Sequence, residues 1–158
     1  MLLPNYFRTL RLVHLGMIFG LLLFLVMGIL TLETGMYHPF APELDRTLQV
    51  ITILLSAAAT VVGFNVFKRK ILAARNSDGP AAGRIRLYMS ACFLWWALMD
   101  APAMLALLCF FMVGNYAFVA LAGFHLLVLL LFMPRKQNII VLLQLTEADL
   151  GQLEGKGQ

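Results

Sequence analysis

The sequence predicts an all-α integral membrane protein with four transmembrane helices, from its composition, its long apolar runs and the uneven distribution of its basic residues. Hydrophobic residues make up 61% of the 158 residues, and charged residues only 13%. A soluble domain has roughly 45–50% apolar and about 25% charged residues. A chain of this length cannot hide that apolar excess in a small core. We therefore expect a single module in lipid, without a separate catalytic domain.

Four apolar runs are long enough to cross the hydrocarbon core as helices, which takes about 20 residues. They are residues 12–32, 48–67, 87–113 and 117–133, and we expect residues 1–134 to form the transmembrane domain. A signal peptide is the competing interpretation of the first run, because Arg8 and Arg11 precede it. No small-x-small cleavage motif follows that run, so we expect a retained helix.

The distribution of Lys and Arg predicts the orientation. Eleven of the 12 basic residues lie near the two termini or between the second and third runs, and Arg46 is alone on the other side. Cytoplasmic loops carry an excess of Lys and Arg, so we expect a multi-pass protein of the cell (inner) membrane with both termini in the cytoplasm. The loop between the second and third runs contains six of these residues: Lys68, Arg69, Lys70, Arg75, Arg84 and Arg86. They determine topology, or they also attract anionic lipid headgroups at about 1 kcal/mol each.

The segment after Pro134 changes character, and we expect residues 135–158 to form a cytoplasmic tail. Residues 139–145 are apolar but too few to span, so they should lie at the membrane interface or pack under the bundle. Thr146 is followed three residues later by Asp149, which is the spacing of a capping box. This spacing predicts a short helix at 147–153.

Asp100 is the one charged residue inside the predicted spans, 13 residues from both Leu87 and Val113. Placing an Asp at the centre of a membrane helix costs about 2.5–3.5 kcal/mol, so we expect it to be protonated or paired with a cation. Pro102 has no amide to donate to the Leu98 carbonyl and predicts a helix break beside the acid. An acid next to a free carbonyl suits an ion or proton site. The alternative is a neutral acid that holds helices together.

Polar residues in two other runs are possible partners for Asp100. Thr52, Ser56 and Thr60 recur every four residues and therefore share one helix face. Counted by helical rise, the depths of Ser56 and Asp100 differ by about 3 Å, so we expect Thr52 and Ser56 to face the acid. The alternative is that these hydroxyls bond carbonyls of their own helix. His125 is a candidate for a proton relay, or otherwise a hydrogen-bonded core histidine.

The segment 98–104 (LMDAPAM) resembles the carboxylate helix of the proteolipid (c) subunits of rotary ATPases. In that family a small-residue helix, a polar loop and a helix with a midmembrane acid form a hairpin, and the acid carries H⁺ or Na⁺. The resemblance implies that Asp100 is the ion-carrying acid. The chain departs from the family in lacking a glycine ladder and in having six basic loop residues and two further helices. As a whole it resembles the small uncharacterised four-helix integral membrane proteins common in bacteria.

The sequence contains no nucleophile–base pair, phosphate-binding loop or metal-ligand spacing, so we expect no enzyme, cofactor or metal site. The basic residues adjoin apolar runs, which is a membrane pattern and gives no indication of nucleic-acid binding. We therefore predict a non-enzymatic accessory or scaffold subunit of a membrane complex. Its partners would be the lipid bilayer and other membrane subunits or a second copy. The alternative is a proton- or cation-binding or translocating subunit that uses Asp100.

Overall fold

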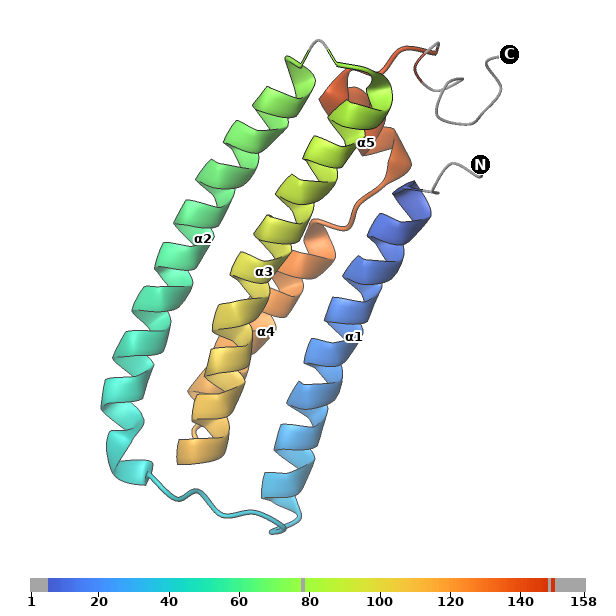
Figure 1. Cartoon of the computed structure of the whole chain (residues 1–158). Helices are drawn as coiled ribbons and strands as arrows, with labels where there is room; N and C mark the ends of the chain where they lie inside the picture. The colour runs from blue at the N-terminus through green and yellow to red at the C-terminus, as the bar shows by residue number, and fades with distance from the viewer. Residues whose placement is uncertain (1–5, 78, 148, 150–158) are drawn as a thin grey trace.

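The structure is a computed structural model, and it describes residues 6–77, 79–147 and 149. All regular elements of these residues are helical. Figure 1 shows four long helices side by side, with a short helix at one end. The elements are α1 (Tyr6–Glu33), the 3₁₀ turn η1 (Pro42–Leu44), α2 (Asp45–Arg75), α3 (Ala81–Val113), α4 (Tyr116–Leu131) and α5 (Lys136–Leu143).

Three of the described helices are long and apolar enough to cross a membrane: α1, α3, and α2 together with η1. The fourth candidate is the pair α4 and α5, which is bent by 73° at the break between them. With 16 residues, α4 rises about 24 Å, less than the roughly 30 Å of a hydrocarbon core. The prediction of an all-helical fold is confirmed, and three helices could cross a membrane, or four if the bent pair counts as one span.

The helices extend beyond the predicted apolar runs, mainly where basic residues begin. The second run ends at residue 67, but α2 continues to Arg75, and α3 begins at Ala81, six residues before the third run. Lys and Arg are good helix formers, so a charge ends an apolar run without ending the helix. In the tail, α5 covers much of the apolar segment 139–145, whereas the helix predicted at 147–153 lies largely outside the described residues.

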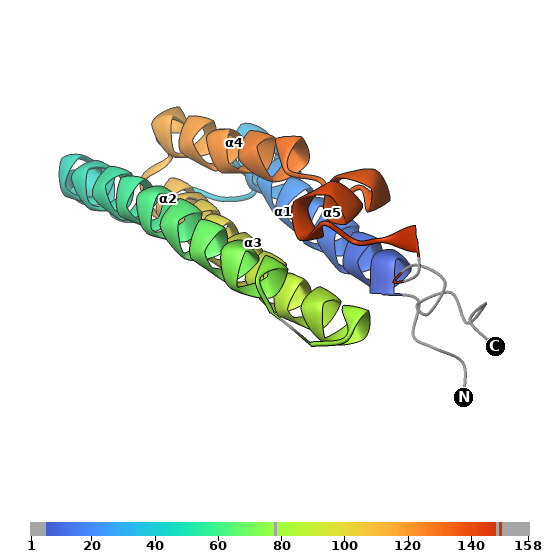
Figure 2. The ribbon, with the colours of Figure 1, turned by 90° about the horizontal axis from the view of Figure 1, so that it is seen from above.

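The central helix is α3, which contacts α1, α2 and α4. Figure 2 shows α2 and α3 side by side, with α4 in a second layer. The two tryptophans of α3 face different neighbours. The Trp95 ring centroid lies 4.4 Å from that of Phe64 in α2, and the Trp96 ring centroid lies 4.6 Å from that of His14 in α1. Gly63 of α2 lets the two helices approach, because a Cβ there would lie 2.9 Å from the Trp95 ring.

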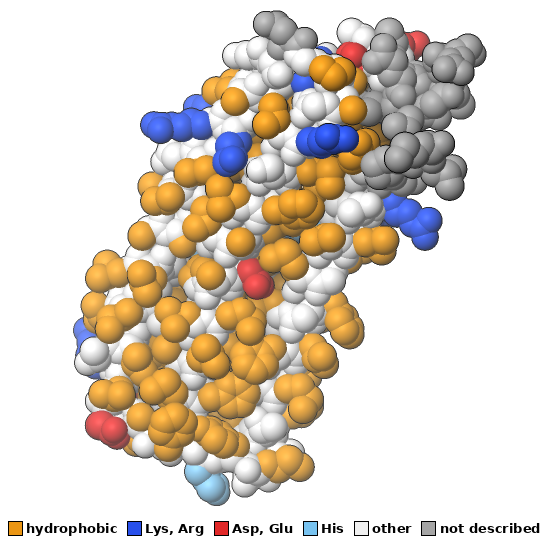
Figure 3. All heavy atoms as spheres, viewed as in Figure 1, with side chains coloured by type: hydrophobic (Ala, Val, Ile, Leu, Met, Phe, Trp, Pro, Cys, Tyr) orange, Lys and Arg blue, Asp and Glu red, His pale blue; other side chains and the backbone are white. Residues whose placement is uncertain are grey.

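The outer surface is apolar along the sides of the bundle and basic toward one end. Large exposed side chains occur on α1, α2 and α4, among them Phe19, Leu54 and Leu131. Figure 3 shows hydrophobic side chains over most of one face, with most of the visible Lys and Arg toward the end where α2 and α3 are connected. We call this the basic end; it also holds the start of α1 and α5 (Figure 1).

The other end of the bundle is joined by polar contacts between loops and helix ends. Asn115 caps α4 by accepting a hydrogen bond from the amide of Ala117, and its own amide group donates to both carboxylate oxygens of Asp45, at 3.0 and 2.9 Å. Gly114 ends α3 with a φ of 76°, where a side chain would meet Pro39. These contacts fix the 34–44 loop and the turn at residues 114–115 against each other.

Candidate functional site

Asp100 lies on α3 at the border between the packed side of the helix and its outer surface. Its side chain is partly exposed and makes no hydrogen bond or ion pair with any described residue. It follows Trp96 by four residues and therefore shares the side of α3 that faces α1. The carboxyl group can thus be reached from outside the bundle.

The expected contact of Thr52 and Ser56 with Asp100 is not formed in the structure. The side of α3 that meets α2 carries Trp95, which packs on Gly63, whereas Asp100 is turned toward α1. The two helices run in opposite directions, so Ser56, seven residues before Gly63, is level with a position about two residues, or roughly 3 Å, beyond Asp100. Ser56 and Asp100 thus lie at similar depths, as expected, but depth does not determine the direction in which a side chain points.

The two threonines of the small-residue stripe bond their own helix. Thr52 is buried, and its hydroxyl donates to the Leu48 carbonyl at 2.7 Å. The Thr60 hydroxyl donates to the Ser56 carbonyl at 2.8 Å. The stripe therefore serves close packing within the bundle, and both hydroxyls are satisfied without a ligand.

Ser56 and His125 form a hydrogen bond between α2 and α4. The Ser56 Oγ and the His125 Nε2 are 2.5 Å apart, and the His125 side chain is 0% exposed. The other ring nitrogen of His125, Nδ1, has no hydrogen-bond partner among the described residues. The structure therefore brings together two of the predicted polar residues, but with each other and not with Asp100.

His14 is a buried polar residue whose position the sequence analysis did not single out. Its Nε2 donates to the Leu129 carbonyl at 3.1 Å, and its side chain is 0% exposed. Leu129 lies in the last turn of α4, where carbonyls have no amide donor within the helix. A carbonyl only accepts, so Nε2 carries the proton, and Nδ1 is left as an acceptor without a partner in the described part of the chain.

The helix break expected at Pro102 does not occur, because α3 continues from Ala81 to Val113 with Pro102 inside it. Pro102 is buried, and so are its neighbours Ala103 and Ala106. Packing against the other helices keeps α3 continuous although one amide is missing. The described residues contain no group of three or more His, Cys, Asp or Glu side chains able to hold a metal ion.

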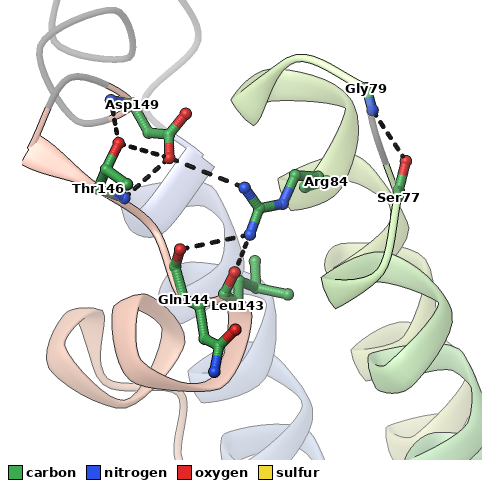
Figure 4. Close-up of polar contacts among 7 residues, drawn as sticks. All are labelled: Ser77, Gly79, Arg84, Leu143, Gln144, Thr146 and Asp149. Carbon is green, nitrogen blue, oxygen red and sulfur yellow. Dashed lines mark hydrogen bonds and ion pairs between the residues drawn. The ribbon is translucent and has the colours of Figure 1, made fainter.

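Arg84, one of the six basic residues between the second and third apolar runs, links α3 to α5. It donates to the carbonyls of Leu143, the last residue of α5, and of Gln144, and its Nη1 lies 3.7 Å from an Asp149 oxygen (Figure 4). This arginine therefore holds the end of α5 against α3. The other basic side chains of the set are exposed or, for Lys70, partly buried: Lys68, Arg69, Lys70, Arg75 and Arg86.

The spacing of Thr146 and Asp149 forms the contacts of a capping box. The Thr146 amide and hydroxyl both donate to Asp149 Oδ2, at 2.8 and 2.9 Å, and the Asp149 amide donates to the Thr146 hydroxyl at 3.2 Å. The bonds from Thr146, and then the positive charge of Arg84, hold the pKa of the Asp149 carboxyl below its ordinary value. The tail is thus anchored by a charged contact outside the spans.

Comparisons with known proteins do not extend this description. No protein-family model, curated protein or solved structure gives a significant match to the chain. The placement of the polar groups is therefore the feature that indicates a function. Two buried histidines are bonded inside the bundle, whereas Asp100 is partly exposed at its surface.

Proposed function

We propose that the chain crosses the cell membrane four times, with the basic end and both termini in the cytoplasm. In this arrangement α4 forms the fourth span, and α5 lies near the cytoplasmic interface because of its 73° bend from α4. The charge distribution supports the orientation, since eleven of 12 basic residues fall toward this end in the sequence. The exposure of Val141 and Leu142 on α5 fits a helix that touches lipid.

We propose further that the protein is a non-enzymatic accessory or scaffold subunit that binds another transmembrane helix through the Asp100 side of α3. The observation that carries this proposal is a partly exposed acid in an apolar surface, without a hydrogen-bond partner among the described residues. An unmet polar group in lipid is costly, and a donor on a partner helix would satisfy it. The neighbouring exposed positions Ala97 and Ala101 are small enough for close approach.

The second candidate function is a proton- or cation-binding subunit that uses Asp100. The same exposure favours it, because a carboxyl at the surface of the bundle can exchange a proton or ion at a subunit boundary. The resemblance of residues 98–104 to proteolipid subunits also supports it. Ser56, Thr60 and His125 do not contribute to such a site in this geometry, since their hydrogen bonds are made elsewhere.

Two substitutions of Asp100 separate these functions. Asn can still donate and accept hydrogen bonds but cannot carry a proton, whereas Leu can do neither. For a scaffold subunit, purification in mild detergent should recover the same associated chains with wild type and Asp100→Asn, and lose them with Asp100→Leu. Ala58→Leu, which adds the same side chain at an exposed position of α2 away from Asp100, is the matched control. A stable monomer in wild type would contradict the scaffold proposal.

A carboxyl-modifying reagent tests the alternative. If Asp100 binds protons from the lipid side, dicyclohexylcarbodiimide should label wild type and not Asp100→Asn. Ion-coupled activity should then be lost in Asp100→Asn while the protein stays inserted and helical. Resistance to labelling at every pH, or full activity of the Asn variant, would exclude this function.

A further inference from the structure

A pocket of about 570 Å³ lies at the basic end between α1 and the start of α5. Its described lining contains four basic side chains, Arg8, Arg11, Arg135 and Lys136, and no acidic one. The first pair comes from α1 and the second from the junction of α4 and α5, more than 120 residues later. Neither pair belongs to the six basic residues at the adjoining ends of α2 and α3.

Two contacts bring these distant charges together. His14 of α1 donates to the Leu129 carbonyl in the last turn of α4, which holds the end of α4 against α1. The Lys136 ammonium lies 5.6 Å from the ring centroid of Phe7, which holds the start of α5 against the same helix. The convergence of these four side chains is therefore a property of the fold.

The rest of the pocket wall is apolar, which indicates an amphiphile rather than a soluble anion. Phe7, Met133, Pro134 and Ile139 complete the described lining, and Ile139 is 2% exposed. Arg11 directly precedes the first apolar run, so the charges lie where that helix enters the hydrocarbon. This is the depth of lipid phosphates.

The start of α5 adds to the positive potential. Arg135 is its N-cap residue, and the Arg135 side chain makes no capping hydrogen bond. The first amide groups of a helix carry partial positive charge and point toward such a ligand. The start of α5 thus adds to the attraction that the four basic side chains have for an anion.

We propose that this pocket binds the phosphate of an anionic phospholipid headgroup, with the acyl chains leaving along the apolar wall. Basic pockets between transmembrane helices on the cytoplasmic side are suited to such headgroups. Arg8 and Arg11, three residues apart, share one face of α1, and Arg135 and Lys136 approach from the other side. The site is separate from Asp100 and does not depend on the function proposed there.

The experiment compares two double variants of the full chain that lose the same charge. Arg11→Gln with Arg135→Gln, the pocket variant, removes two cations from the pocket. Arg69→Gln with Arg86→Gln, the α2–α3 variant, removes two exposed cations from the adjoining ends of α2 and α3. Both leave the orientation signal strong and equal. Purified protein in nonionic detergent is titrated with phosphatidylglycerol, and bound lipid is counted by native mass spectrometry. Circular dichroism verifies that each variant keeps its helix content.

The pocket variant should bind phosphatidylglycerol about 30-fold more weakly than wild type, which corresponds to about 1 kcal/mol for each of two charges. The α2–α3 variant should bind phosphatidylglycerol within about threefold of wild type, and phosphatidylcholine should bind all three proteins weakly. Equal weakening in both double variants would show general surface attraction and overturn the site. An unchanged affinity of the pocket variant would overturn it as well.

A second arm distinguishes the lipid from a soluble phosphate. Inorganic phosphate and glycerol 3-phosphate are added at the concentrations at which phosphatidylglycerol saturates the protein. If the site is built for a lipid, neither should displace the bound lipid or raise the thermal unfolding midpoint as the lipid does. Displacement by glycerol 3-phosphate at these concentrations would assign the pocket to a soluble organic phosphate and overturn the lipid proposal.

Discussion

The hydrogen bond between Ser56 and His125 joins two helices that make little other contact, α2 and α4. Replacing Ser56 with Ala leaves both ring nitrogens of a fully buried histidine without a partner among the described residues. Hydrogen bonds between membrane helices average about 0.6 kcal/mol, and an unsatisfied buried group costs about 1–3 kcal/mol. We expect Ser56→Ala to lower the free energy of unfolding by about 1–3 kcal/mol, measured by detergent-induced unfolding in mixed micelles.

Thr60→Ala is the control for this measurement. The Thr60 hydroxyl bonds a carbonyl of its own helix, which also accepts the backbone amide, so its removal should change the free energy by less than about 0.5 kcal/mol. Equal losses in the two variants would mean that the bond between helices contributes nothing of its own.

At the residue scale, the sequence located the buried polar residues of the bundle better than it predicted their hydrogen-bond partners. Thr52, Ser56 and His125 were recognisable because polar groups are rare in apolar runs, and all three are buried. Their partners depend on the rotation of each helix about its axis, which a count of residues does not give. His14 is harder still, since it bonds a backbone carbonyl at the end of α4, and no side chain marks that acceptor in the sequence.

At the scale of elements, the contact between α2 and α3 depends on the absence of a side chain at Gly63. A Cβ there would lie 2.9 Å from the Trp95 ring, and that ring is held by Phe64, Phe67 and Phe132. Because the ring cannot move away freely, Gly63→Ala should force the helices apart and destabilise the protein by about 1–3 kcal/mol. The same mixed-micelle unfolding measures it.

Gly20→Ala in α1 provides the opposite expectation. This glycine is exposed and a Cβ there meets nothing within 4 Å, so alanine should leave stability unchanged or raise it by up to about 1 kcal/mol through helix propensity. A similar loss at both glycines would attribute the effect to α-helix chemistry rather than to the α2–α3 contact.

The contacts of Asp149 with Thr146 and Arg84, which hold the segment after α5, should depend on pH. The pKa of Asp149 is lowered by its bonds from Thr146 and by Arg84, so its stabilising contribution is complete above the ordinary Asp value of about 3.9 and is lost as pH falls through the lowered pKa. The Thr146 amide resonance should therefore titrate below pH 3.9 in an NMR experiment. Thr146→Ala removes the hydroxyl bond and keeps the amide bond, and it should raise this pKa more than Arg84→Gln does, because the hydroxyl bond is a larger cause than the Arg84 charge. The reverse order would contradict the arrangement in Figure 4.

The elements themselves were predictable because apolar length is a strong signal, whereas their ends and the bend were not. The runs located α1 to α4, but the run at 117–133 does not show that α4 stops at Leu131, or that the chain turns by 73° before α5. Met133 and Pro134 adjoin the bend, and Pro cannot continue a helix from the preceding turn. The direction of α5 is then set by what it packs on, including the Arg84 contact with the end of the helix.

At the scale of the whole molecule, the two ends of the bundle are built differently. The end opposite the basic one is closed by loop contacts, such as the amides of Phe40 and Ala41 donating to the Met112 carbonyl. The basic end carries α5, the lipid pocket proposed above and the α2–α3 connection. The charge at one end supports the proposed orientation, in which that end faces the cytoplasm.

Labelling of single cysteines tests this orientation and the number of spans together. Cys92 and Cys109 are both buried and are first replaced by Ala. Met36→Cys, at an 80% exposed position of the 34–44 loop opposite the basic end, should react with a membrane-impermeant maleimide on intact cells. Asn76→Cys and Gln137→Cys, both exposed at the basic end, should react only after the membrane is opened.

The result at Gln137 decides whether α4 is a true span. If α4 crosses, Gln137→Cys behaves like Asn76→Cys, because both lie at the basic end although α4 alone rises only about 24 Å. Reaction of Gln137→Cys together with Met36→Cys would leave three spans and place the tail outside. It would also remove the proposed lipid pocket from the cytoplasmic leaflet, since Arg135 and Lys136 precede this position directly. The short fourth helix is therefore the element on which the topology of the molecule depends.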